Sequence, residues 1–108
     1  MAPFFMDKAD QQKWRKALKN LHFLCACQKP VRVRRCATSS DIFGDTDLKD
    51  DHFAIRINRE LDFQTALDTL IHEWAHALSW SEAPVFKEEH GPMWGVAFAA
   101  CYRAVHEE

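Results

Sequence analysis

The sequence predicts a small α+β domain, in which one helix is followed by a short β-sheet and then by two further helices. Apolar residues recur every three or four positions over about 7–25, 62–78 and 92–104, which is typical of amphipathic helices. Between the first two of these stretches, apolar and polar residues alternate over 31–34 and 53–58. A period of two is typical of strands that bury one face.

The composition and the ends of the chain limit the class of protein. The chain has 108 residues, 47% of them hydrophobic and 28% charged, so we expect one domain, 1–108, around one core. A net charge of -2 provides no overall attraction to nucleic acid. The first seven residues lack the basic region and apolar run of a signal peptide, and no apolar stretch reaches membrane-spanning length. We therefore expect a cytoplasmic protein with reduced thiols and no membrane association.

The first helix is expected to begin after Asp7, whose side chain can cap it, and to run to about Cys25. Cysteines and a histidine near its end, namely His22, Cys25, Cys27 and Cys36, raise the question of a second zinc site. Their spacing is not that of a zinc finger or ribbon, so buried structural thiols are predicted, and Cys101 is expected to be another.

The segment that follows contains the two predicted strands. Val31–Arg34 alternates valine with arginine and predicts a strand with one apolar and one basic face. With Lys29 and Arg35, that basic face suits nucleic acid or an acidic partner, or protects an exposed sheet edge from pairing. Residues 38–51 are polar, lack the glycine and final glutamate of a calcium-binding EF-hand, and are expected to form a turn or long hairpin loop. Phe53–Asn58 is the second predicted strand.

The next helix, capped by Asp62, carries the main motif of the chain. His72 and His76 are four residues apart, so a helix stacks them on one face, where both imidazoles reach one metal ion. Glu73 lies beside that metal and can take a proton from a water there, an H-E-x-x-H arrangement typical of zinc hydrolases. The alternative is a buried helix whose histidines bond to backbone carbonyls. Asp68 either orients His72 or is a surface carboxylate.

A catalytic zinc ion usually takes three protein ligands, so a third must be found. Glu82 stands where metzincins have a histidine, and no aspartate follows Asp68. The best candidate is His90, because Pro92 favours a helix start and a turn between packed helices would return His90 to the pair. The alternative for His90 is a loop histidine that caps the last helix. The remaining candidate ligands are Glu82, Glu88 and Glu89.

A family resemblance is carried by two runs, His72-Glu73-Trp74-Ala75-His76-Ala77 and His90-Gly91-Pro92-Met93-Trp94. They resemble the SprT-like (Spartan-type) zinc metallopeptidases, which have H-E-x-x-H and, after a variable loop, H-G-P-x-[FW]. The resemblance is sharp over about 72–98 and vague over 31–71. It implies Zn²⁺ held by His72, His76 and His90, with Glu73 as catalytic base, in a zincin-like domain with two metal-bearing helices. Family members often act on DNA-bound proteins and frequently carry a zinc ribbon. This chain has no C-x-x-C pair and would be a minimal domain without it.

We therefore expect a zinc-dependent endopeptidase whose polypeptide substrate is unfolded or bound to DNA. Glu73 would accept a proton from water and pass it to the leaving amine. Tyr102, Arg103 and His106 are open candidates for the donor to the oxyanion. An extended substrate would pair with a sheet strand, and either predicted strand is a candidate. The rival is a non-catalytic module that keeps zinc for stability and binds a protein or nucleic acid, although such a module has no use for Glu73.

Overall fold

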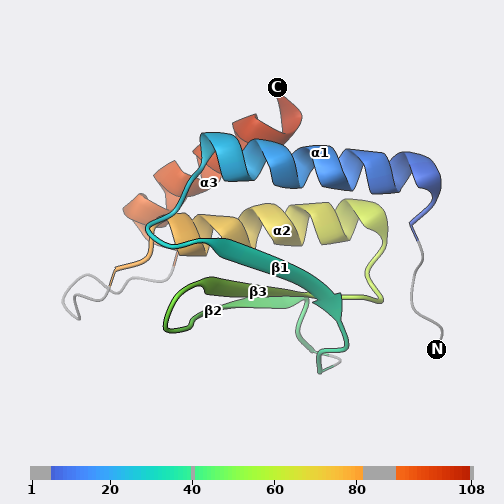
Figure 1. Ribbon diagram of the computed structural model, residues 1–108, viewed down its shortest axis with the longest axis horizontal. Helices are drawn as coiled ribbons and strands as arrows, with labels where there is room; N and C mark the ends of the chain where they lie inside the picture. The colour runs from blue at the N-terminus through green and yellow to red at the C-terminus, as the bar shows by residue number, and fades with distance from the viewer. Residues whose placement is uncertain (1–5, 40, 82–89, 108) are drawn as a thin grey trace.

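Figure 1 shows the computed structural model of the chain, which describes residues 6–39, 41–81 and 90–107. Over these residues the chain forms an α+β fold, as the sequence predicts. Its elements are α1 (Lys8–Leu24), β1 (Val31–Cys36), β2 (Gly44–Leu48), β3 (Phe53–Asn58), α2 (Phe63–Leu78) and α3 (Pro92–His106).

The strands form one mixed sheet in the order β1-β3-β2. Strand β3 is the middle strand, parallel to β1 and antiparallel to β2. The sheet edges are therefore β1 and β2. The predicted strands over 31–34 and 53–58 are both confirmed, and β1 extends two residues further, to Cys36.

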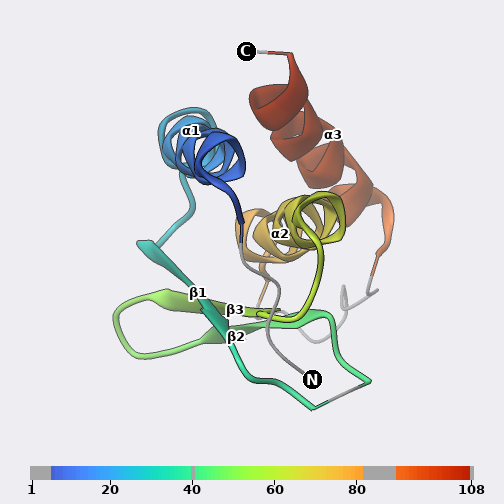
Figure 2. The ribbon, with the colours of Figure 1, turned by 90° about the vertical axis from the view of Figure 1, so that its right-hand side faces the viewer.

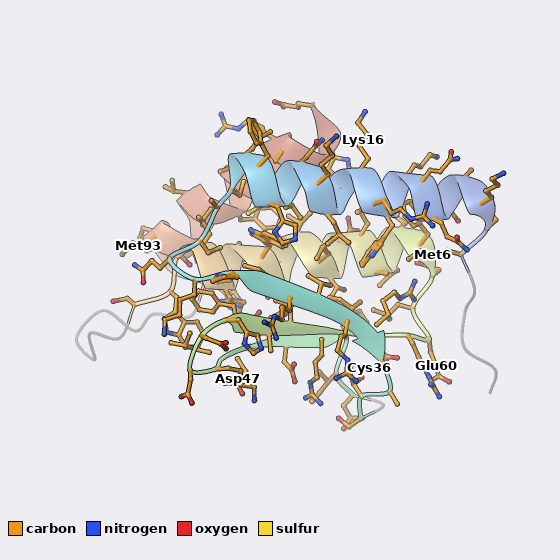
Figure 3. All side chains as sticks on the ribbon, in the orientation of Figure 1. Met6, Lys16, Cys36, Asp47, Glu60 and Met93 are labelled. Atoms are coloured by element: carbon orange, nitrogen blue, oxygen red, sulfur yellow. The ribbon has the colours of Figure 1, made fainter. Side chains whose placement is uncertain are left out.

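Strand β2 corrects the expectation of a polar loop over 38–51. It is hidden in the sequence because it contains no alternating large apolar side chains. Asp45 and Asp47 occupy one face, and Asp47 points away from the helices in Figure 3. Gly44 and Thr46 occupy the other face, towards α2, where there is little room for larger groups.

The helices lie on one side of the sheet, and α2 is sandwiched between the strands and the other two helices (Figures 1 and 2). Its side chains Leu70 and Trp74 are completely buried. The Trp74 indole N–H donates to the carbonyl of Cys25 over 2.9 Å, so the end of α1 is tied to α2. Burial on both sides explains why α2 is apolar around most of its circumference.

Both predicted helix caps are present. Asp7 accepts a hydrogen bond from the amide of Asp10 over 2.8 Å, and Asp62 accepts one from the amide of Thr65 over 2.7 Å. Each aspartate accepts from a backbone N–H in the first turn that has no carbonyl partner within the helix. Pro92 occupies the first turn of α3, as expected.

The cysteines are all free, and the prediction of buried thiols is confirmed for Cys25 and Cys101, whereas Cys27 and Cys36 are only half-buried. Cys25 and Cys101 are buried and lie in contact with each other, and burial raises the pKa of both thiols. His22 packs edge-on against Trp74 at a ring separation of 4.9 Å. None of the described helices is long and apolar enough to cross a membrane.

Candidate metal centre

Three histidine side chains converge at the end of α2 and the start of α3. The Nε2 atom of His90 lies 3.1 Å from Nε2 of His72 and 3.1 Å from Nε2 of His76, and the latter two atoms are 3.3 Å apart. Over the described ranges, this is the one group of three or more histidine, cysteine, aspartate or glutamate side chains arranged to hold an ion. The site therefore unites the three histidines that the sequence singled out.

Local structure explains how each histidine is placed. One helical turn separates His72 from His76, so both face the same side of α2. His90 adopts a left-handed backbone with φ of 61°, and Gly91 is the N-cap residue of α3. This bend directs the His90 imidazole back onto the pair. The rival ligands Glu82, Glu88 and Glu89 lie outside the described residues.

The arrangement of nitrogens fits a cation better than a hydrogen-bond network. A neutral imidazole nitrogen either donates or accepts, so among three mutually adjacent Nε2 atoms at least two are of the same kind. Hydrogen bonds cannot satisfy the whole triangle. A tetrahedral zinc ion with Zn–N bonds of 2.0–2.1 Å would place its ligand nitrogens ~3.3–3.4 Å apart, close to the separations found here. The residues present fit a metal ion with three imidazole ligands.

Glu73 lies beside this triangle without belonging to it. It is only 8% exposed. Its Oε2 atom is 3.9 Å from Nε2 of His72, whereas Oε1 accepts a hydrogen bond from the hydroxyl of Thr46 over 2.7 Å. A buried carboxylate next to the imidazoles is the position expected of a base that handles a proton near the metal. Thr46 was missed by the sequence reasoning, because it lies in the segment expected to be a loop.

Trp94, in the first turns of α3, forms an aromatic wall of the site. Its ring centroid lies 5.1 Å from that of His72, 5.8 Å from that of His76 and 4.9 Å from that of His90. Its indole N–H points at the carbonyl of His72 over 3.4 Å, and its ring stacks on Phe98. The Trp94 ring therefore restricts the rotation of the three imidazoles.

Other side chains considered from the sequence lie elsewhere. The Asp68 carboxylate accepts from the Gln64 amide over 3.0 Å, as a surface residue would. Tyr102 lies eight residues beyond Trp94 on α3, which is ~12 Å along the helix axis. Arg103 and His106 lie in the same last turns of α3 and are exposed. The three candidate oxyanion donors therefore lie at least two helical turns beyond Trp94.

The thiols near the end of α1 do not form a second metal site. Over the described part of the chain, His22, Cys25, Cys27 and Cys36 do not come together as a ligand group. Burial raises the pKa of Cys27 to about 11, and the neighbouring Cys25 adds to this effect.

The basic face of β1 is smaller than the sequence suggested. Arg32 and Arg34 are exposed. Arg35 instead turns inward, donates to the carbonyls of Arg59 and Leu61 over 3.0 and 2.9 Å, and lies near the ring of Trp14. These hydrogen bonds hold the connection between β3 and α2 in place, so the role of Arg35 is structural.

The sheet edge beside the site is β2, which was not one of the two strands that the sequence offered for substrate pairing. Strand β3 is paired on both sides and has no free edge, while β1 lies across β3 from β2. Thr46 of β2 bonds to both the carboxylate and the backbone carbonyl of Glu73. The edge strand next to Glu73 is therefore one that the sequence did not reveal.

Comparison with known proteins finds no family model, curated protein or solved structure that matches this chain. The resemblance to SprT-like metallopeptidases stays a prediction from the two motifs.

Proposed function

We propose that this chain is a zinc-dependent endopeptidase of the H-E-x-x-H type. The observation that carries the proposal is the convergence of three Nε2 atoms, from His72, His76 and His90, beside a buried carboxylate that is not part of their triangle. Zinc bound by these imidazoles would supply Lewis acidity, which activates water and polarises a carbonyl.

Glu73 supplies the proton transfer in this proposal. Its Oε2 atom faces the imidazoles, so it can accept the proton of the attacking water and return it to the leaving amine. Structural zinc sites are closed by four protein ligands, whereas catalytic sites keep three and leave a position open. Three ligands among the described residues favour the catalytic kind over a zinc-stabilised binding module.

The edge of β2 supports one class of substrate. Among the described residues β2 is an edge strand beside the base, and such an edge can pair with an extended polypeptide through backbone hydrogen bonds, which recognise many sequences. Only an unfolded or locally extended segment presents its backbone in this way. We therefore favour polypeptides with unfolded segments, and proteins held on DNA are a narrower case of the same class.

The test compares cleavage of a reduced, unfolded protein by the zinc-loaded parent and by Glu73→Gln. The parent should cut at several sites. Glu73→Gln should lose at least ~100-fold in rate, since general acid–base catalysis contributes that much, while its zinc content and circular dichroism stay unchanged. The matched control is Glu60→Gln, because Glu60 is exposed and lies outside the site. A Glu73→Gln variant that cuts as fast as the parent would overturn the assignment of the base.

The same assay separates the rival functions. If the parent cleaves no unfolded or DNA-bound protein, and a partner binds the parent and Glu73→Gln equally, the chain is a binding module. Added DNA tests the narrower substrate class, because a DNA-dependent rate should fall steeply as salt rises. An unchanged rate with DNA would restrict the proposal to unfolded polypeptides.

A further inference from the structure

We infer that Thr46 is a positioning residue, whose hydroxyl holds Oε1 of Glu73 so that Oε2 faces the three histidines. This inference rests on the proposed function and adds to it a residue outside both recognisable motifs. Thr46 comes from the sheet, 27 residues before Glu73. It therefore couples the edge of β2 to the base on α2.

The hydrogen bond distinguishes the two carboxylate oxygens. The Thr46 hydroxyl lies 2.7 Å from Oε1 of Glu73 and 3.0 Å from the carbonyl oxygen of the same residue. The terminal torsion of a glutamate side chain is broad, so a bond to one oxygen selects which oxygen faces the reaction. Here the other oxygen, Oε2, is the one 3.9 Å from Nε2 of His72. A bond to a charged acceptor is also stronger than one to a neutral acceptor.

Thr46 is itself held in place by the sheet. It lies opposite Ile55 in the antiparallel pairing of β2 with β3, and its branched side chain has a stiff first torsion. Gly44, on the same face of β2, permits the close approach to α2. A Cβ at position 44 would lie 2.8 Å from the Thr69 methyl carbon and 2.7 Å from the carbonyl oxygen of Arg56. The hydroxyl reaches Glu73 because the strand lies this close to the helix.

A hydroxyl suits this role for a chemical reason. A cation at the same place would hold the carboxylate in its ionised form and oppose the uptake of a proton. The threonine hydroxyl is neutral and can both donate and accept. It donates to Oε1 of the carboxylate, and Oε1 remains an acceptor for this hydrogen bond when Oε2 takes up the proton of the attacking water. The Thr46 hydroxyl therefore stays bonded to Glu73 before and after the proton transfer.

The test uses Thr46→Val, which removes the hydroxyl and keeps the branched shape, and Thr46→Ser, which keeps the hydroxyl. The matched control is Thr69→Val. Thr69 lies one helical turn before Glu73, and its hydroxyl bonds to the carbonyl of Thr65 instead. In zinc-loaded enzyme, kcat should fall ~10–100-fold in Thr46→Val with KM nearly unchanged, because a small displacement of a catalytic group costs that much. Thr46→Ser and Thr69→Val should keep kcat within a few-fold of the parent.

Two further readouts separate this inference from the proposed function. Crystal structures of the zinc-loaded parent and of Thr46→Val should show the Glu73 carboxylate turned in the variant alone, with zinc content unchanged. If the parent cleaves nothing, the endopeptidase proposal fails, and the carboxylate orientation still decides whether Thr46 holds Glu73. An unmoved carboxylate, an unchanged kcat in Thr46→Val, or an equal loss in Thr46→Ser would overturn the inference. If Thr46→Val does not fold, Thr46→Ala takes its place in both measurements.

Discussion

The Nε2 atoms of His72 and His90 lie 3.1 Å apart, although 18 residues separate the two histidines in the chain. His72 belongs to the regular helix α2, whereas His90 has a left-handed backbone immediately before α3. The contact between them brings α2 against the residues that lead into α3. A metal ion held there would join the two helices.

Replacing His90 by glycine should separate its backbone role from its ligand role. A non-glycine residue at φ of 61° is strained, and glycine adopts this conformation at little cost. We expect the metal-free variant to be within about 1 kcal/mol of the parent in free energy of unfolding. Zinc should raise the melting temperature of the parent and leave that of His90→Gly nearly unchanged. The control is His106→Ala on the exposed end of α3. Zinc should raise the melting temperature of this variant as much as that of the parent.

The two glycines at positions 44 and 95 should respond in opposite ways to alanine. Gly44→Ala forces a Cβ to within 2.7 Å of the Arg56 carbonyl oxygen, which belongs to the paired backbone of β3 and cannot move aside. We expect a loss of about 1–3 kcal/mol in stability from this overpacking. A Cβ added at Gly95 would meet nothing within 4 Å, and this residue lies inside α3, so Gly95→Ala should stabilise by about 0.5–1 kcal/mol. Urea unfolding of both variants measures the contrast. Equal effects of the two substitutions would mean that β2 does not approach α2 so closely.

The thiol of Cys27 should make stability depend on pH in the alkaline range. Burial raises its pKa from the ordinary value of 9.0 to about 11. The folded protein therefore holds this proton more tightly than the unfolded chain, and unfolding releases it between these two values. The contribution of the protonated Cys27 thiol to the free energy of unfolding is complete below about pH 9 and is lost as the pH rises towards 11. Urea midpoints at pH 7.5 and pH 10 should differ more for the parent than for Cys27→Ala. The same loss in both proteins would show that Cys27 does not contribute.

Alkylation by iodoacetamide provides a separate measurement on the same thiol. Thiolate is the reactive form, and at pH 8 a thiol with a pKa of about 11 is ~0.1% ionised. The labelling rate of Cys27, followed by peptide mass spectrometry, should rise nearly tenfold for each pH unit from 8 to 10. Rapid labelling at pH 7 would contradict the raised pKa of this half-buried thiol.

The parts of the fold that the sequence could predict depend on local patterns. The spacing of His72 and His76 needs only a helix to bring them together, and the aspartate caps act within three residues of their helices. His90 was predictable because Gly91 and Pro92 mark the start of α3 next to it. For His72, His76 and the caps, short-range geometry determines where the side chain lies. For His90 it determines only the place before α3, and the approach to the pair depends on the packing of α3 against α2.

The parts that the sequence could not predict depend on long-range packing. Strand β2 contains Asp45, Asp47 and Gly44, which disfavour strands by propensity, and pairing with β3 overrides that preference. Thr46 acquires its contact with Glu73 only because the sheet and α2 pack together. The choice of β2 as the edge beside the site likewise follows from strand order, which no local pattern encodes.

The most direct test of the account is anomalous diffraction at the zinc edge from crystals of the parent protein loaded with zinc. We predict one strong peak per chain, bonded to Nε2 of His72, His76 and His90 at ~2.0–2.1 Å, with Glu73 near the ion but not among its ligands. A peak that lacks His90, a Glu73 oxygen bonded directly to the ion, or the absence of any peak at the three histidines would contradict the account.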